Sequence, residues 1–575
     1  MDEPTPYLRN AAQDLPALSY CDATPAALGN WLGTLPRQQI GPFAQKLYQL
    51  LVELNRLQAP ASARFALLER LRPEVQLACR QLDQWIARSG VLDERTRRAM
   101  TLAQALQTYL ASGYKRIALE PTGTEPVSDL VAKAFQRILR VLLGPLLRTA
   151  GLYTQAPPGF WVEAHGLYQA AQRQNLHQKA IAEAQHGGNA QTIEHAYMTL
   201  LLLGCGRTNQ LRPGAITALA AWLEEHAHLA TLTAQKPSGA RLVVSPELDA
   251  PPREPSLNAH YCPTDLAIDP SRLLIALGNA QVRSGPTGLT PDVVSHLQRT
   301  WGDNPIRTFN RTPAQGTLRC CIGMTAIHTL LADGEDFQSQ LRKTSASRTA
   351  RYRLDNEQPD VWASVLNTES PTDWLGLPSQ AVNYQSDAAA AATDDDEVIL
   401  HDPHIVNHSP GGYCLRWPGE APPTLQVGEL LAIDDRRQGW GVAVVRWLNR
   451  RASDTRIGIE MIAPEARPCG LRMIYKVRQD VDYVRGLLLP EIKALARPAM
   501  LITPRLPFHE GCKATVNLQG HERRALLHEQ QGVTASFGQF TFDWLQSLPE
   551  DATEQKSGAA YDAGRPIQPP ASLRF

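Results

Sequence analysis

Residues 407–413, written NHSPGGY, join the apolar pair Ile405-Val406 to the alternating run 413–417, YCLRW. Alternation of apolar and polar residues predicts a strand with one buried face. An amide, a hydroxyl and two adjacent glycines at the entry to such a strand have two interpretations. One is a β-turn, which these residue types favour. The other is a backbone shaped to receive a ligand, and the surrounding sequence favours this second interpretation.

Short alternating or β-branched runs lie on both sides of this stretch, with turn residues between them. This pattern is typical of a small antiparallel barrel and predicts one over residues 304–480. The runs are residues 316–331, 403–418, 425–434, 440–449, 455–462 and 469–477. Between the first two runs we expect an insertion over residues 334–400, which includes the low-complexity loop QSDAAAAATDDDE.

Two motifs frame the first two runs. Arg307 and Arg311 form an RxxxR motif just before the first run, and Asn407, Ser409 and Gly412 fit the pattern [D/N]xSxxG. Together with the strand series, they make residues 304–480 resemble a PilZ domain, the bacterial receptor fold for cyclic di-GMP. The resemblance implies that the two arginines take phosphates and guanine Hoogsteen edges, while the other three residues frame a guanine.

The residue types suit that ligand on chemical grounds as well. A guanidinium can bind the O6/N7 edge of guanine, stack on a base or hold a phosphate. The amide of Asn407 both donates and accepts hydrogen bonds, and the Ser409 hydroxyl suits a phosphate oxygen. Gly412 allows a close backbone approach.

Three features depart from the pattern of a compact PilZ domain. Asn407 stands where many members of the family have Asp, and the insertion places roughly 96 residues between Arg311 and Asn407. A second RxxxR, Arg446 to Arg450, follows the Ser409 motif and lies inside an expected strand, so its order is wrong. A barrel that has lost the nucleotide is therefore the alternative.

The rest of the chain predicts a multidomain α + β protein. Residues 1–235 show apolar residues at three- and four-residue spacing and predict an α-helical region, for which we favour an irregular bundle over helical repeats. Residues 236–303 predict a linker with one short strand and two helices. We expect a small β-rich extension over 481–548 and a disordered tail over 549–575.

Composition narrows the function. The chain of 575 residues has 57 basic and 57 acidic residues, which argues against nucleic-acid binding. Nine cysteines without a disulfide-like framework, no secretory leader and no membrane span predict a cytoplasmic protein. No P-loop, GxSxG, HExxH or dinucleotide fingerprint occurs, so we expect no enzyme and no catalytic residue.

Two other clusters contain residue types that bind metal ions or form redox pairs. His401, His404 and His408, with Asp402, resemble metal ligands, but His401 would point away from the other two on a strand, so we expect no metal site. Cys320 and Cys321 are adjacent on an expected strand and face opposite ways, so we expect one core and one surface position rather than a redox pair.

The sequence therefore predicts a cyclic di-GMP-binding effector that needs no cofactor besides this regulatory ligand. Binding would order the arginine arm and couple second-messenger level to a protein partner. The family resemblance suggests a partner in surface motility, type IV pili or adhesion. The alternative function is a nucleotide-independent scaffold that docks proteins through the helical region and a degenerate barrel.

Overall fold

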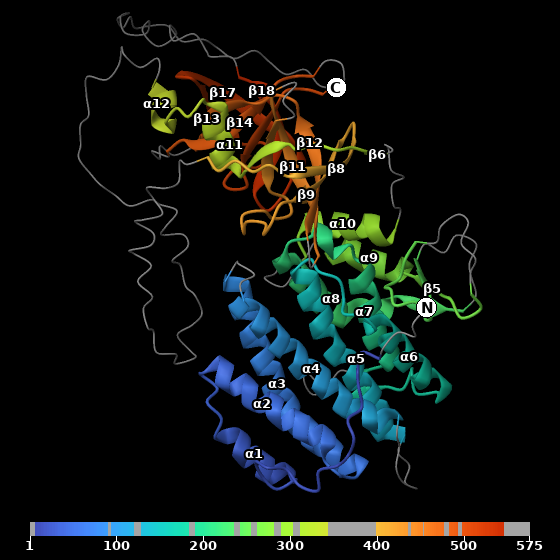
Figure 1. Ribbon diagram of the computed structural model, residues 1–575. Coiled ribbons are helices and arrows are strands. Elements are labelled where there is room, and N and C mark those ends of the chain that lie inside the picture. The colour runs from blue at the N-terminus through green and yellow to red at the C-terminus, as the bar shows by residue number, and fades with distance from the viewer. Residues whose placement is uncertain are drawn as a thin grey trace, which may run out of the picture.

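The computed structural model describes most of the chain. The described residues are 6–89, 94–119, 128–182, 190–234, 242–254, 262–280, 289–302, 311–342, 398–434, 439–451, 454–475, 482–492 and 497–545. Helices occupy the N-terminal part, and strands occupy the C-terminal part (Figure 1). The expected tail over 549–575 and the residue Arg307 lie outside the described residues.

The N-terminal part is a helical bundle, as the apolar spacing predicts. In the second helix, Phe43, Leu47, Leu50, Leu51 and Leu54 recur on one side and are all buried. The helices are α1 (Pro25–Gly33), α2 (Ile40–Arg56), α3 (Ala61–Ser89), α4 (Glu94–Leu119), α5 (Ser128–Gly151), α6 (Phe160–Arg173), α7 (Ile193–Cys205) and α8 (Pro213–His226). The two-stranded hairpin of β1 (Ile181–Ala182) and β2 (Ala190–Gln191) precedes α7.

A short mixed segment follows the bundle. Its sheet has the order β3-β5-β4, and it contains β3 (Thr231–Thr233), β4 (Leu242–Val244) and β5 (Leu266–Asp269). The two expected helices are α9 (Ser271–Ala280) and α10 (Pro291–Trp301). Asp269 accepts a hydrogen bond from the Ser271 N–H at 3.0 Å and so caps the start of α9.

The middle sheet has seven antiparallel strands in the order β6-β8-β9-β12-β11-β10-β7. They are β6 (Thr312–Pro313), β7 (Arg319–Ile322), β8 (His404–Ser409), β9 (Gly412–Trp417), β10 (Leu430–Asp434), β11 (Trp440–Arg450) and β12 (Thr455–Ala463). Isolated bridges Thr317↔His404 and Cys320↔His401 join the chain around β7 to the chain around the start of β8. These bridges bring the two edges of the sheet together, as a small barrel requires.

The first expected strand run is only partly a strand. Residues 319–322 form β7, but Gly323 turns the chain with φ +90°, and α11 (Met324–Leu331) follows, then α12 (Phe337–Arg342). Helix α11 buries Ile327 against the cluster that also contains Cys321. Because this helix covers one face of β7 and the sheet interior covers the other, both Cys320 and Cys321 are buried, and the expected surface position was wrong.

The last expected strand of the middle domain belongs to the next domain. Strand β13 (Arg467–Met473) pairs with β14 (Val484–Leu489) and β16 (Lys513–Leu518), not with the middle sheet. With β15 (Met500–Pro504), β17 (His521–Val533) and β18 (Phe537–Trp544), these strands form a closed six-stranded barrel around Leu501, Phe508 and Phe540. The sheet therefore ends before residue 467, earlier than the expected boundary at 480.

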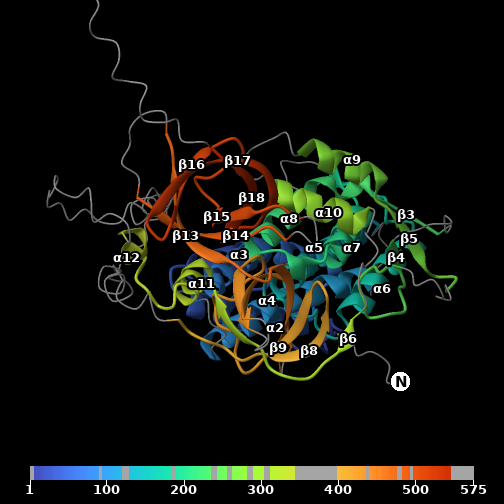
Figure 2. The same ribbon diagram turned by 90° about the horizontal axis from the view of Figure 1, so that it is seen from above.

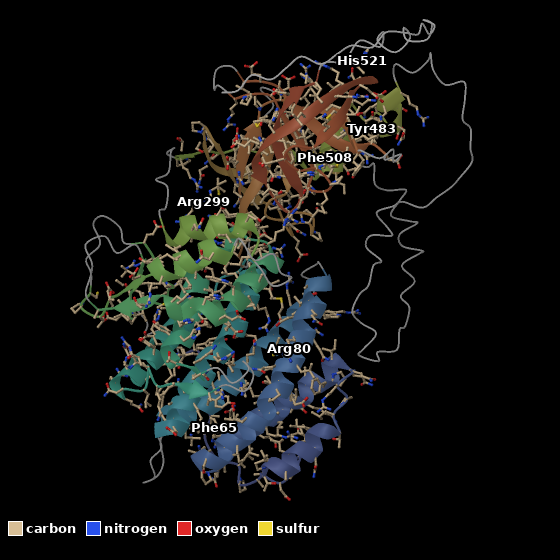
Figure 3. All side chains as sticks on the ribbon, turned by 180° about the vertical axis from the view of Figure 1, so that it is seen from behind. Phe65, Arg80, Arg299, Tyr483, Phe508 and His521 are labelled. Carbon is tan, nitrogen blue, oxygen red and sulfur yellow. The ribbon has the colours of Figure 1, made fainter. Side chains whose placement is uncertain are left out.

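The three parts are in contact. The barrel and the middle sheet lie side by side at one end of the helical bundle (Figures 1 and 2). Tyr483 and Phe508 in the barrel lie far from Phe65 in α3 (Figure 3). One buried apolar cluster runs from Leu8 in the helical part to Ile459 in the sheet. Within the described part of the chain, no helix has the length and apolar character needed to cross a membrane.

Candidate functional site

The quoted stretch folds as a hairpin at the edge of the middle sheet. Ser409 pairs with Gly412 at the turn, so Asn407 and Ser409 lie on β8 while Gly412 begins β9. The Ser409 hydroxyl donates to the Gly412 carbonyl at 3.4 Å. The turn interpretation and the ligand interpretation therefore apply to the same residues.

Strand β6 carries Arg311 to this hairpin. Thr312 pairs with His408, and Pro313 pairs with Asn407. Continuing this register places the exposed Arg311 opposite Ser409. The structure thus brings together four of the five expected site residues, although a long insertion separates them in sequence. The fifth, Arg307, lies outside the described residues.

The strand register arranges the residues of one sheet face in three rows. Cross-strand partners share a face, and successive residues alternate between faces. The first row is Arg311, Ser409, Gly412 and Glu460; the second is Asn407, Cys414, Gly458 and Trp447; the third is His404, Arg416, Arg456 and Asn449. We call these twelve residues the open face.

The opposite face of the same strands is the sheet interior. Leu415, Ile457 and Ile459 are buried there and pack into the large apolar cluster. Their alternation with the open-face residues supports the assignment of rows. The register shift between Ile405 and Asn407 keeps Ile405 on the inner face and Asn407 on the open face.

Electrostatics at Cys414 supports the same arrangement. Burial raises the pKa of the Cys414 thiol, whereas the guanidiniums of Arg311 and Arg456 act in the opposite direction. Both guanidiniums therefore lie close to the thiol, one from the β6 side and one from β12. Arg456 also donates to Asp454 at 3.0 Å.

Two glycines, Gly412 and Gly458, lie on the open face because neighbouring groups leave no room for a side chain. A Cβ on Gly412 would lie 2.0 Å from the Ile459 carbonyl oxygen, so β12 excludes a side chain there. A Cβ on Gly458 would lie 1.9 Å from Trp447 Nε1, so the indole lies directly over this glycine. An aromatic plane and several guanidiniums therefore surround backbone that carries little side chain.

This combination fits a ligand with phosphates and purine bases. Guanidiniums bind phosphates and guanine edges, and an indole offers a stacking surface. A cavity of about 600 Å³ lies elsewhere, at the other end of β11, where Trp440, Leu331, Asp333 and Glu465 line it. Its two carboxylates make it a poor site for an anionic phosphodiester, so the open face is the better candidate.

Sequence reasoning missed Trp447, Arg416 and Arg456. These residues become neighbours of Asn407 only through the pairing of β9 with β12 and of β12 with β11. A signal was present in Gly458, a glycine inside an expected strand, which often marks a close approach of another group. Among the described residues, no group of three potential metal ligands gathers, and His401 instead packs its ring against Trp417.

Known proteins resemble the chain along most of its length. Three family profiles of the cyclic-di-GMP receptor FimW match: its N-terminal domain over residues 26–238, its middle PilZ domain over 241–468 and its C-terminal β-barrel domain over 469–545. The Pseudomonas aeruginosa protein "Cyclic-di-GMP receptor FimW" is 41% identical in an alignment that covers 94% of this chain and 92% of that protein. No solved structure matches the chain.

Proposed function

We propose, for a chain that belongs to the FimW family of cyclic-di-GMP receptors, that the open face of the middle sheet binds cyclic di-GMP. The observation that carries this proposal is the pairing of β6 with β8, which sets Arg311 beside Ser409 and Asn407. A guanidinium, an amide and a hydroxyl at one sheet edge can hold a phosphate and a guanine at the same time.

Each residue has a role in this proposal. Arg307 and Arg311 take phosphates and Hoogsteen edges, while Asn407, Ser409 and Gly412 frame a guanine. The Trp447 indole stacks on a base, and Arg416 and Arg456 supply positive charge on the side nearer the helices. The chain needs no cofactor and catalyses no reaction; the dinucleotide is a regulatory ligand.

The position of the open face favours coupling to the helical part. Strand β11 carries Trp447, and three residues later the Arg450 N–H donates to the Tyr153 carbonyl at 2.8 Å. Burial lowers the pKa of Arg450, which lies near both Tyr153 and Glu420. Ligand binding at the open face would act on this contact along β11, and the helical part would pass the signal to a protein partner in the cytoplasm.

Calorimetric titration with cyclic di-GMP tests the binding site. We expect saturable binding to the intact protein and a loss of affinity of about 10-fold or more in Arg307→Ala and in Arg311→Ala, because each loses a charge-assisted contact. Arg299→Ala, which removes an exposed arginine on α10 (Figure 3), should bind like the intact protein. If the intact protein does not bind cyclic di-GMP, the result would favour the alternative function, a nucleotide-independent scaffold.

The output requires a separate experiment. We propose that the partner belongs to the motility or pilus machinery, as the resemblance to PilZ proteins suggests. Cells in which Arg311→Ala replaces the native protein should lose the response of surface motility and pilus assembly to cyclic di-GMP. An unchanged response in cells that contain normal amounts of the variant would contradict this output.

A further inference from the structure

The open face contains a carboxylate, which would repel the anionic ligand proposed for this face. Glu460 is the single carboxylate within the described strands β6, β8, β9, β11 and β12. It pairs with Gly412, which in turn pairs with Ser409. Because Gly412 has no side chain, the carboxylate of Glu460 and the hydroxyl of Ser409 lie on either side of bare backbone.

Arg446 holds this carboxylate. Its Nε lies 2.7 Å from Glu460 Oε2, and the two side chains are 52% and 50% exposed. Arg446 is the extra residue of a β-bulge, because Val445 pairs with Ile459 and Trp447 pairs with Gly458. A bulge redirects a side chain from its normal alternation, so Arg446 can reach Glu460 beside Trp447.

The two arginines of the second RxxxR motif, Arg446 and Arg450, therefore have different surroundings. Arg450 is half-buried and is turned toward Tyr153 of the helical part, with Glu420 also near it. Arg446 lies at the open face with water access. Only Arg446 is free to exchange its carboxylate partner for a ligand from solution.

We propose that Arg446 is a further ligand-binding residue and that Glu460 sets the affinity by competing with the ligand for it. In the empty receptor the ion pair neutralises Arg446. When the dinucleotide binds, the guanidinium leaves the carboxylate and takes a phosphate, to which it can bind in bidentate geometry. The carboxylate of Glu460 then faces the negative charge of the ligand and weakens its binding. This exchange rests on the proposed function, the binding of cyclic di-GMP at the open face.

The exposure of the pair makes this exchange feasible. Ion pairs between half-exposed side chains contribute little to folding stability. The exchange thus breaks a weak contact, and it can occur without disturbing the strands. The same exposure means that either residue can be replaced with little effect on the fold.

The test is calorimetric titration with cyclic di-GMP of the full chain, Glu460→Gln, Arg446→Ala and the double variant. We expect Glu460→Gln to bind about 3- to 10-fold more tightly and Arg446→Ala to bind about 5- to 20-fold more weakly. The gain from Glu460→Gln should be smaller when Arg446 is absent, because one of its two effects is to release Arg446. Melting temperatures without ligand should match the intact protein.

A matched ion pair provides the control. Arg56 and Asp14 in the helical part are also 2.7 Å apart and 42% and 52% exposed, so Asp14→Asn should leave ligand affinity unchanged. The exchange is wrong if Glu460→Gln binds cyclic di-GMP no more tightly than the intact protein does. It is also wrong if Glu460→Gln gains as much affinity in the Arg446→Ala background as in the intact protein. If the intact protein does not bind at all, the proposed function fails instead, so the two failures are distinguishable.

Discussion

At the scale of single residues, Gly412 shows how one position serves both the fold and the site. Its φ of +153° and the 2.0 Å approach of the Ile459 oxygen explain the glycine without any ligand. The same missing side chain leaves only buried backbone between Ser409 and Glu460. A family motif that is described as a ligand signature is thus also a packing requirement of two neighbouring strands.

Replacement of Gly412 by Ala should destabilise the protein. The added Cβ must push β12 away from β9, so we expect a loss of about 2–4 kcal/mol and a lower urea midpoint. Gly166→Ala is the control, because this exposed glycine inside α6 has no atom within 4 Å of the new Cβ and should be stabilised slightly. A stable Gly412→Ala protein would contradict the packing account.

Replacement of Gly458 by Ala should act on binding more than on stability. The new Cβ must displace the Trp447 indole, which is a movable side chain rather than backbone. We expect a several-fold weaker affinity for cyclic di-GMP, since base–aromatic stacking contributes about 1–3 kcal/mol. Trp447→Phe, which keeps an aromatic plane, should bind better than Trp447→Ala. Equal affinities of these two variants would contradict a stacking role.

At the scale of elements, the sequence predicts the helices and strands in which apolar residues keep one regular spacing. It does not predict the segments whose structure depends on contacts with other elements. The long helices and strands β9 to β12 follow from apolar spacing alone. Residues 324–331 looked like strand, but Gly323 breaks the run and α11 finds an apolar surface on both β7 and the barrel. The pairing of β13 with β14 and β16 also could not be predicted, because the choice between two sheets depends on contacts far along the chain.

Part of the candidate site could be predicted from sequence motifs, and part depends on strand pairing. Motif spacing gave Arg311, Asn407, Ser409 and Gly412 together, and the structure places these four residues at one sheet edge. Trp447 and Arg456 required the register of two further strand pairs. A register shift of one residue would turn both side chains to the other face, and no single-strand pattern fixes that choice.

The contact between α6 and α7 predicts a pH dependence. His165 is buried, its Nε2 lies 3.1 Å from the Ala250 carbonyl, and its Nδ1 lies 2.6 Å from the Tyr197 hydroxyl. The carbonyl can only accept, so Nε2 carries the proton and Nδ1 accepts from the hydroxyl. Burial lowers the pKa of His165 to about 4. The folded protein therefore resists protonation of this ring.

In the unfolded chain the same histidine titrates near 6.5. The unfolded state thus takes up a proton first as pH falls, and stability decreases between about pH 6.5 and pH 4, by up to about 1.4 kcal/mol per pH unit. Urea unfolding as a function of pH should show this slope in the intact protein and a smaller slope in His165→Gln. Identical slopes would contradict the account.

At the scale of the whole molecule, one small cluster joins all three parts. Arg212, just before α8, donates to the Val427 carbonyl at 2.8 Å and to Glu429 Oε2 at 3.2 Å in the middle domain. It also contacts Ser536 of the barrel, whose hydroxyl donates to Glu429. Gly428 and Glu429 in turn form backbone hydrogen bonds with Val445, next to the bulge that carries Arg446.

Removal of Arg212 should weaken the joint between the domains. Arg212 and Glu429 are 26% and 18% exposed, so Arg212→Ala leaves a mostly covered carboxylate without its cation. We expect a loss of about 2–3 kcal/mol, measured by urea unfolding. The control is Arg97→Ala, which breaks a 58% and 65% exposed pair with Glu420 and should cost less than about 1 kcal/mol. Equal losses would argue against a special role for Arg212.

The pairing of β6 and β7 with strands made much later has a consequence for biosynthesis. Arg311 leaves the ribosome before its partners on β8, and the open face is complete only when Glu460 has been added, roughly 150 residues later. At ordinary elongation rates of about 5–20 residues per second, this interval lasts on the order of 10–30 s. A nascent chain can therefore build its helical bundle well before its open face is complete.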